Sequence, residues 1–277
     1  LGAVKPGKTM LPVRRRKAGC ASSSAASAWL RVSFHRMQGR IGRSAAGYPR
    51  PAAISWWTVV VLGLAVAGFS VVQVAGMPAS SKVLILAGTV IAMLAGLFPV
   101  RIPGSKNAFA AGEIFMFLLL LLFGPAAAAL AAAGEALLGS WRASRRWTSR
   151  IISPCSAALS MFISGALLQE LIARLQALEV YNDGILLVAT MLFSVVYFIV
   201  NTFMISAVPK LKGGQPLRLD GLFSVFSWVG LAYAGSSALA SLLYLAYRTS
   251  GIVVLAGVVP VLATLLVALH FAFRQQE

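Results

Sequence analysis

The chain has 277 residues, of which 59% are hydrophobic and only 11% are charged. This composition excludes an ordinary soluble domain, in which about 25% of residues are charged. The formal net charge of +17 would suit a nucleic-acid partner, but eleven of the 24 Lys and Arg residues precede Ala52, in a segment without acidic residues. Most of the others stand in short segments between apolar runs, where positive charge orients membrane helices. We therefore expect a membrane protein that does not bind nucleic acid.

The first fifty residues form a basic segment rich in Arg, Ala, Ser and Gly, with no apolar run long enough for a signal-peptide core. This composition predicts that residues 1–50 are a disordered basic tail on the cytoplasmic side. Because the chain begins with Leu1 rather than Met, Met10 and Met37 are candidate translation starts. Part of this tail need not be translated in vivo.

Eight apolar runs follow the tail, most of them close to the about 20 residues that a helix needs to cross a bilayer. We therefore predict an all-α fold, a polytopic transmembrane helical bundle of about eight spans within residues 51–274. Residues 275–277 would begin a truncated cytoplasmic connector. The predicted spans are 55–75, 82–98, 107–123, 126–141, 151–173, 184–208, 221–247 and 251–273.

The charges between these runs predict how the bundle is oriented. With the N-terminus inside, ten basic residues beyond the tail fall on the inner side and three, Lys82, Arg174 and Arg248, on the outer side. This bias follows the positive-inside rule, so both termini would be cytoplasmic, as in a multi-pass protein of the bacterial inner membrane. The third and fourth runs are short, and a re-entrant pair at 107–141 is the alternative to two full crossings.

The segment 107–141 carries two acidic residues in otherwise apolar sequence. Glu113 lies eleven residues before Gly124, and Glu135 lies ten residues after Pro125. Since Gly124-Pro125 is a natural turn, a rise of ~1.5 Å per residue places both carboxyl groups roughly 16 Å from it on adjacent helices. A glycine precedes each Glu and allows the helices to approach closely. The sequence therefore predicts paired carboxylates inside the membrane, which form a candidate functional site.

The carboxylate pair has two interpretations. Two carboxylates in contact cannot both ionise cheaply, so the pair would hold a proton, a cation or another ligand. Alternatively, each Glu is a structural contact, hydrogen-bonded to a neighbouring helix or paired with an arginine of the next loop. Asn201, a lone amide in the sixth span, likewise predicts either an interhelical hydrogen bond or a ligand contact.

A basic loop follows the fourth span and contains two tryptophans. We expect it to anchor the protein to anionic lipid headgroups, and contact with a cytoplasmic output domain is the alternative. Its arginines are Arg142, Arg145, Arg146 and Arg150.

The remaining features argue for packing rather than chemistry. Small residues recur at helical spacing in the seventh span, at Gly230, Ala234 and Ala238, and predict a seam between helices. His270 has no second His or Cys near it in the sequence, so no metal, haem or other cofactor is expected. There is no nucleotide-binding loop, nucleophile elbow or zinc-ligand spacing, and we therefore expect that this chain is not an enzyme.

The run from Leu97 to Arg150 has a characteristic order of elements. The loop FPVRIP at 98–103 precedes an apolar helix, the Gly124-Pro125 turn, an Ala-rich helix and the basic loop. In this order the run, about a fifth of the chain, resembles the integral-membrane sensory region that precedes bacterial cyclic-di-GMP output domains. Those outputs are GGDEF diguanylate cyclases and EAL or HD-GYP phosphodiesterases.

The resemblance implies a membrane-embedded sensory or anchoring domain of a signal-transduction protein. No GGDEF, EAL or HD-GYP domain is found in the 277 residues, so cyclase or phosphodiesterase activity would belong to a missing part. The expected partners are the lipid bilayer, a second copy in a homodimer, and a fused or associated output domain. Glu113 and Glu135 would contact a ligand or proton that shifts the bundle between two packings.

A second interpretation is a small integral-membrane transporter, or the substrate-binding subunit of an uptake system with short Ala-rich helices. Such a protein needs a polar cavity near the middle of the membrane and usually has internal repeats. The two Ala-Gly-Glu tripeptides are the one repeat in this chain, and they are short. A membrane-embedded enzyme is a third interpretation, but it would need a cluster of catalytic residues that the sequence lacks.

Overall fold

The computed structural model describes residues 49–96, 100–101, 108–109, 112–212, 220–258, 260–261 and 264. Nearly all of the predicted basic tail, the predicted connector at 275–277 and His270 lie outside the described residues. Most of the FPVRIP loop lies outside them as well.

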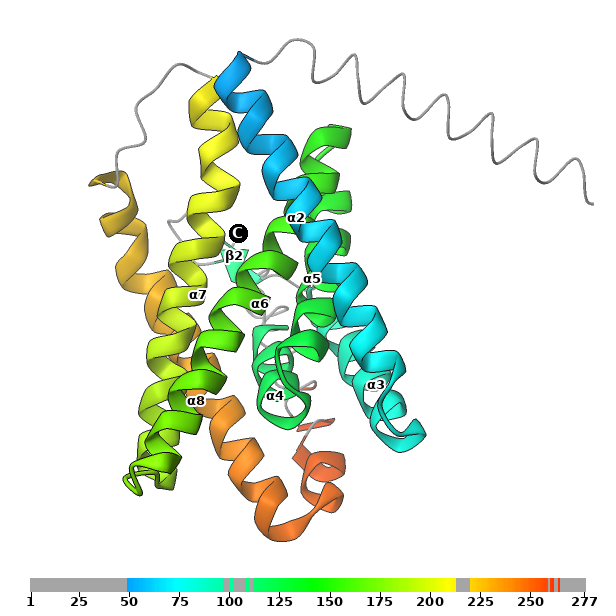
Figure 1. Cartoon of the computed structure of the whole chain (residues 1–277), viewed down its shortest axis with the longest axis vertical. Coiled ribbons are helices and arrows are strands. Elements are labelled where there is room, and N and C mark those ends of the chain that lie inside the picture. Colours follow the sequence, from blue (N-terminus) through cyan, green and yellow to red (C-terminus); the bar gives the residue numbers. More distant parts are fainter. Residues whose placement is uncertain are drawn as a thin grey trace, which may run out of the picture. The chain divides into compact units, whose positions relative to one another are not determined.

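The described chain is helical apart from one short pair of strands (Figure 1). The strands β1 and β2 have two residues each and pair antiparallel, with Val100 opposite Phe109 and Arg101 opposite Ala108. A further helical stretch at 252–258 follows α8. In chain order the elements are α2 (Arg50–Ala75), α3 (Ala79–Gly96), β1 (Val100–Arg101), β2 (Ala108–Phe109), α4 (Glu113–Phe123), α5 (Pro125–Ala143), α6 (Trp147–Ala177), α7 (Asp183–Lys212) and α8 (Asp220–Ser250).

Five described helices are long and apolar enough to cross a membrane: α2, α3, α6, α7 and α8. They match the first, second, fifth, sixth and seventh predicted spans. Many large apolar side chains of α2 and α3 are exposed, as lipid-facing side chains would be. The helical class and these apolar helices are therefore confirmed for the described residues, and the count of eight spans stays a prediction.

The third predicted span is wrong at its start. A helix was expected from residue 107, but Ala108–Phe109 is a strand and α4 begins at Glu113. An apolar run is compatible with either a strand or a buried helix. Here Ala108–Phe109 is a strand because it pairs with Val100–Arg101. With 11 residues, α4 is only about 16 Å long, roughly half of the ~30 Å hydrocarbon core of a bilayer.

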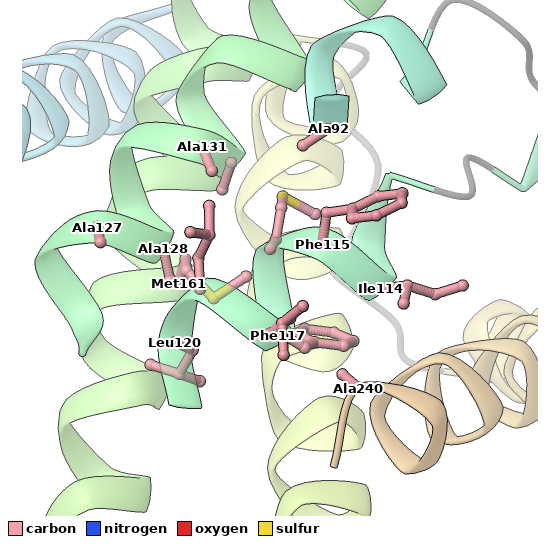
Figure 2. Close-up of a cluster of buried hydrophobic side chains, with 14 of the residues drawn as sticks. Ala92, Ile114, Phe115, Phe117, Leu120, Ala127, Ala128, Ala131, Met161 and Ala240 are labelled. Atoms are coloured by element: carbon pink, nitrogen blue, oxygen red, sulfur yellow. The ribbon is translucent and has the colours of Figure 1, made fainter. Parts of the chain in front are cut away.

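The short helix α4 lies in the core of the described structure. Every residue from Ile114 to Leu120 is buried. Figure 2 shows Phe115, Phe117 and Leu120 among alanines of α5, Met161 of α6 and Ala240 of α8. The alanines of α5 have small side chains, so its backbone can approach α4 closely. A helix enclosed on these sides has no face left for lipid, which explains why α4 is apolar all round.

A small-residue contact joins α2 to α6. A Cβ atom on Gly63 would lie 2.5 Å from the Cys155 carbonyl oxygen, so glycine is required for this approach. Near the start of both helices, the Trp56 indole N–H donates to the Thr148 carbonyl oxygen at 3.2 Å. This bond places the first turns of α2 beside the first turn of α6.

The seam between α7 and α8 is lined by hydroxyl groups. Ser237 donates to Ser194 at 3.2 Å, and Thr190 and Ser241 share a hydrogen bond of 2.5 Å. The seam predicted at Gly230, Ala234 and Ala238 stays a prediction: Gly230 is buried, and a Cβ atom there would meet nothing within 4 Å. The hydrogen bonds show that α8 packs against α7 with the face that carries Ser237 and Ser241.

Candidate functional site: a buried carboxylate pair

The first carboxylate of the site stands at the beginning of α4. Glu113 is the first residue of this helix, and its side chain is only 4% exposed. The N-terminus of a helix carries a partial positive charge, which stabilises a carboxylate in the first turn. The site therefore begins at the first turn of α4, inside the structure rather than at its surface.

The second carboxylate comes from α5 and is surrounded by glycines. Glu135 is 7% exposed. A Cβ atom on Gly96, the last residue of α3, would lie 2.7 Å from its Cγ atom, and one on Gly112 would lie 2.6 Å from its Oε1 atom. The backbones on both sides of Glu135 thus approach its side chain more closely than any residue with a side chain would allow. Gly112 immediately precedes Glu113, so the same contact brings the two acidic residues together.

Two tyrosines complete the polar centre of the site. The Tyr233 hydroxyl of α8 donates a hydrogen bond to the Glu113 carboxylate. Tyr197 of α7 is 2% exposed and is electrostatically coupled to both carboxylates. The carboxylates are also coupled to each other. Residues from α4, α5, α7 and α8 therefore form one buried polar cluster.

This cluster leaves acceptor capacity unused. The Oε2 atoms of Glu113 and Glu135 are buried and have no hydrogen-bond partner among the described residues. A buried polar group without a partner costs about 1–3 kcal/mol, and a charged one costs more. The ionisable groups that interact with the Glu113 carboxyl group are Glu135 and Tyr233. When either of them ionises, its charge is negative. An arrangement of this kind suits a proton or a bound cation.

An aromatic cluster surrounds the tyrosines and links the site to two long helices. The Phe117 ring of α4 lies edge-on to Phe193 and to Tyr197 of α7, with ring centroids 5.6 Å and 5.9 Å apart. The Tyr233 ring of α8 lies 5.9 Å from Tyr197 and 5.0 Å from Phe198. Because these rings are tightly packed, a shift of α4 would displace the rings of both α7 and α8.

The third candidate, Asn201, lies on α7 one helical turn after Tyr197. Its Oδ1 atom is buried and has no hydrogen-bond partner among the described residues. The interhelical hydrogen bond expected of this oxygen is therefore not present there. The spacing of four residues puts Asn201 on the same face of α7 as Tyr197.

Arg150 holds the basic loop to the helix ends on either side of it. The Arg150 Nε atom donates to the Ser144 carbonyl oxygen at 2.7 Å, and its guanidinium lies over the rings of Trp141 and Trp147, 4.7 Å and 5.5 Å from their centroids. This arginine therefore closes the turn from α5 to α6. The other three, Arg142, Arg145 and Arg146, are exposed.

Sequence reasoning found the two acidic residues but missed the tyrosines and one of the glycines that surround them. Tyr197 and Tyr233 stand singly in apolar runs, and a lone hydroxyl in such a run is the signal that could have found them. No group of three or more His, Cys, Asp and Glu side chains that could hold a metal ion occurs in the described part of the chain.

Comparison of the chain with protein-family models, with curated proteins and with solved structures gives no match.

Proposed function

We propose that this chain is the membrane-embedded sensory domain of a bacterial signal-transduction protein, with the Glu113–Glu135 pair as its sensing site. The observation that carries the proposal is the hydrogen bond from Tyr233 to Glu113, because it ties the buried carboxylates to α8. A change in the charge or occupancy of the pair would change the strength of this bond. The two states of the bond provide the differential interaction that a switch between two helix packings needs.

The order of elements from the FPVRIP loop to the basic loop supports an output that makes or degrades cyclic-di-GMP. In this proposal the domain lies in the bacterial inner membrane with both termini in the cytoplasm, and a fused or associated catalytic domain reads the position of α8 and the residues after it. The chain itself carries no catalytic role. Its exposed arginines face the inner surface, where they would hold anionic lipids.

The test is a fusion of the chain to a GGDEF catalytic domain through a helical linker, with cyclic-di-GMP measured in bacteria. We expect Glu113→Gln and Glu135→Gln to change the output several-fold at equal protein level, because each replaces a carboxyl group that can gain or lose a proton by an amide that cannot. Glu170→Gln is the matched control, since Glu170 is exposed and pairs with Arg174 at 2.8 Å on α6. Equal output from all four proteins would refute the proposal.

A transporter is the second candidate, and the observation that favours it is the half-length helix α4 that begins beside the carboxylates. Interrupted helices of this kind surround substrate and ion sites in secondary transporters. In this case Glu113→Gln and Glu135→Gln would abolish the uptake of a solute by proteoliposomes. A reporter that responds to these substitutions while no solute moves would favour the sensor.

A further inference from the structure

Three pairs of side chains connect α7 to α8, and on both helices each pair is four residues from the next. The pairs are Thr190 with Ser241, Ser194 with Ser237, and Phe198 with Tyr233. The first two pairs are hydrogen-bonded, and the third is a ring contact with centroids 5.0 Å apart. Because the numbering rises along α7 as it falls along α8, these pairs fix an antiparallel register between the two helices.

The next layer of this register lacks such a contact. Asn201 stands two helical turns after Ser194, and Gly230 stands two turns before Ser237, so the register places Asn201 opposite Gly230. The Oδ1 atom of Asn201 is buried and has no hydrogen-bond partner among the described residues. Gly230 is buried, and a Cβ atom there would meet nothing within 4 Å. In the described part of the chain, the series of paired contacts therefore ends at Tyr233.

The backbone of α8 is weakest at this same level. Gly230 and Gly235 lie on either side of Tyr233, and a Cβ atom on either glycine would meet nothing within 4 Å. The packing therefore requires neither glycine, unlike Gly63 of α2. A glycine inside a helix lowers the stability of the helix, because its backbone has more freedom to lose. Gly-Ser pairs such as Gly235-Ser236 are also common positions of a helix kink.

We propose that α8 bends at residues 230–235, so that its N-terminal part moves relative to α7 while the hydroxyl pairs keep its C-terminal part in place. The Tyr233 side chain lies between the two glycines and donates its hydrogen bond to Glu113. This bond holds the bending segment to α4 and controls its angle. The inference rests on the proposed function in one respect, because the movement would be the change of helix packing that the sensory site governs.

The length of the moving part sets the size of the movement. Asp220 is the first residue of α8 and precedes Gly230 by ten residues, which is roughly 15 Å of helix. A kink of about 20° would therefore displace Asp220 by about 5 Å. The same kink would leave Ser237 and Ser241 beside α7, because they lie on the other side of the bend.

The experiment measures the distances between spin labels on pairs of introduced cysteines, by pulsed electron paramagnetic resonance on the purified chain in detergent. One pair, Ile205→Cys with Asp220→Cys, joins α7 to the N-terminal end of α8. The reference pair, Leu192→Cys with Leu242→Cys, uses exposed positions near the hydroxyl pairs. The native thiols are first removed by two substitutions, Cys20→Ser and Cys155→Ala.

We expect Tyr233→Phe to shift the first distance by about 5 Å and to leave the reference distance unchanged. Glu113→Leu removes the acceptor of the same hydrogen bond and should give the same shift, so it serves where Tyr233→Phe prevents folding. Tyr247→Phe is the matched control, because it removes a hydroxyl from α8 roughly 21 Å further along the helix and should change neither distance. Gly230→Ala combined with Gly235→Ala stiffens the segment without a clash and should suppress the shift.

Three results would overturn the inference. The first is a distance from α7 to Asp220 that does not change when the hydrogen bond is removed. The second is an equal shift of the reference pair, which would mean that α8 moves as a whole. The third is a shift that persists with alanine at both glycines. The labels report movement in a chain without an output domain, so a fusion whose output ignores the carboxylates while α8 still bends would refute the sensory function alone.

Discussion

Replacing Gly63 by alanine tests the contact on which the packing of α2 against α6 depends. The added methyl carbon would lie 2.5 Å from the Cys155 carbonyl oxygen and 2.7 Å from the Cys155 Cα atom. Both atoms belong to the backbone of α6, so no change of side-chain rotamer can relieve the overlap. The two helices must move apart, and the neighbouring buried residues must follow them.

The size of the effect follows from two opposing terms. Overpacking a close contact costs about 1–3 kcal/mol. Alanine is the better helix former by about 1 kcal/mol and offsets part of this loss. We therefore expect Gly63→Ala to lower the free energy of unfolding by up to about 2 kcal/mol, and by about 1–3 kcal/mol relative to an alanine at an open glycine of the same helix.

The assay is reversible unfolding of the purified chain in mixed detergent micelles with increasing SDS, followed by circular dichroism. Gly68→Ala is the matched control, because Gly68 is exposed on the same helix and a Cβ atom there would meet nothing within 4 Å. We expect this control to be neutral or stabilising. A Gly63→Ala chain as stable as the control would show that the α2–α6 contact is not tight and would refute the reasoning.

The same unfolding assay tests a stacking contact, a backbone conformation and a hydrogen bond. Arg150→Lys should lower stability by about 1 kcal/mol, because lysine cannot reproduce the planar stacking on Trp141; an unchanged value would contradict this role. Glu179→Gly should raise stability by about 1 kcal/mol, since Glu179 has a φ of 57° in the turn after α6, and a loss would show that its side chain matters more than its backbone. A double-mutant cycle of Thr190→Val and Ser241→Ala should give a coupling of about 0.6 kcal/mol, as is typical of interhelical hydrogen bonds in membranes, and additive effects would mean that the bond contributes nothing.

Counting residues from the turn at Gly124-Pro125 was sufficient to predict that Glu113 and Glu135 come together. The reason is that the rise of a helix fixes how far along its axis each residue lies. The same reasoning failed at Ala108–Phe109, which pairs as a strand where a helix was expected, and α4 begins only at Glu113. The partner strand, Val100–Arg101, lies outside the apolar run, so the hydrophobicity of the run does not reveal the pairing.

The sequence by itself determined that this protein is a bundle of apolar helices, because continuous hydrophobicity over the length of a bilayer leaves the chain few other ways to satisfy its backbone. It also determined where most of the helices lie. Only the tertiary structure decided which face each helix turns inward, and therefore that Tyr197, Tyr233 and Gly96 meet at the carboxylates. In helices that are apolar nearly all round, hydrophobicity does not distinguish one face from another. The choice is made by a few close glycine contacts and hydroxyl hydrogen bonds, which form only when the helices are packed.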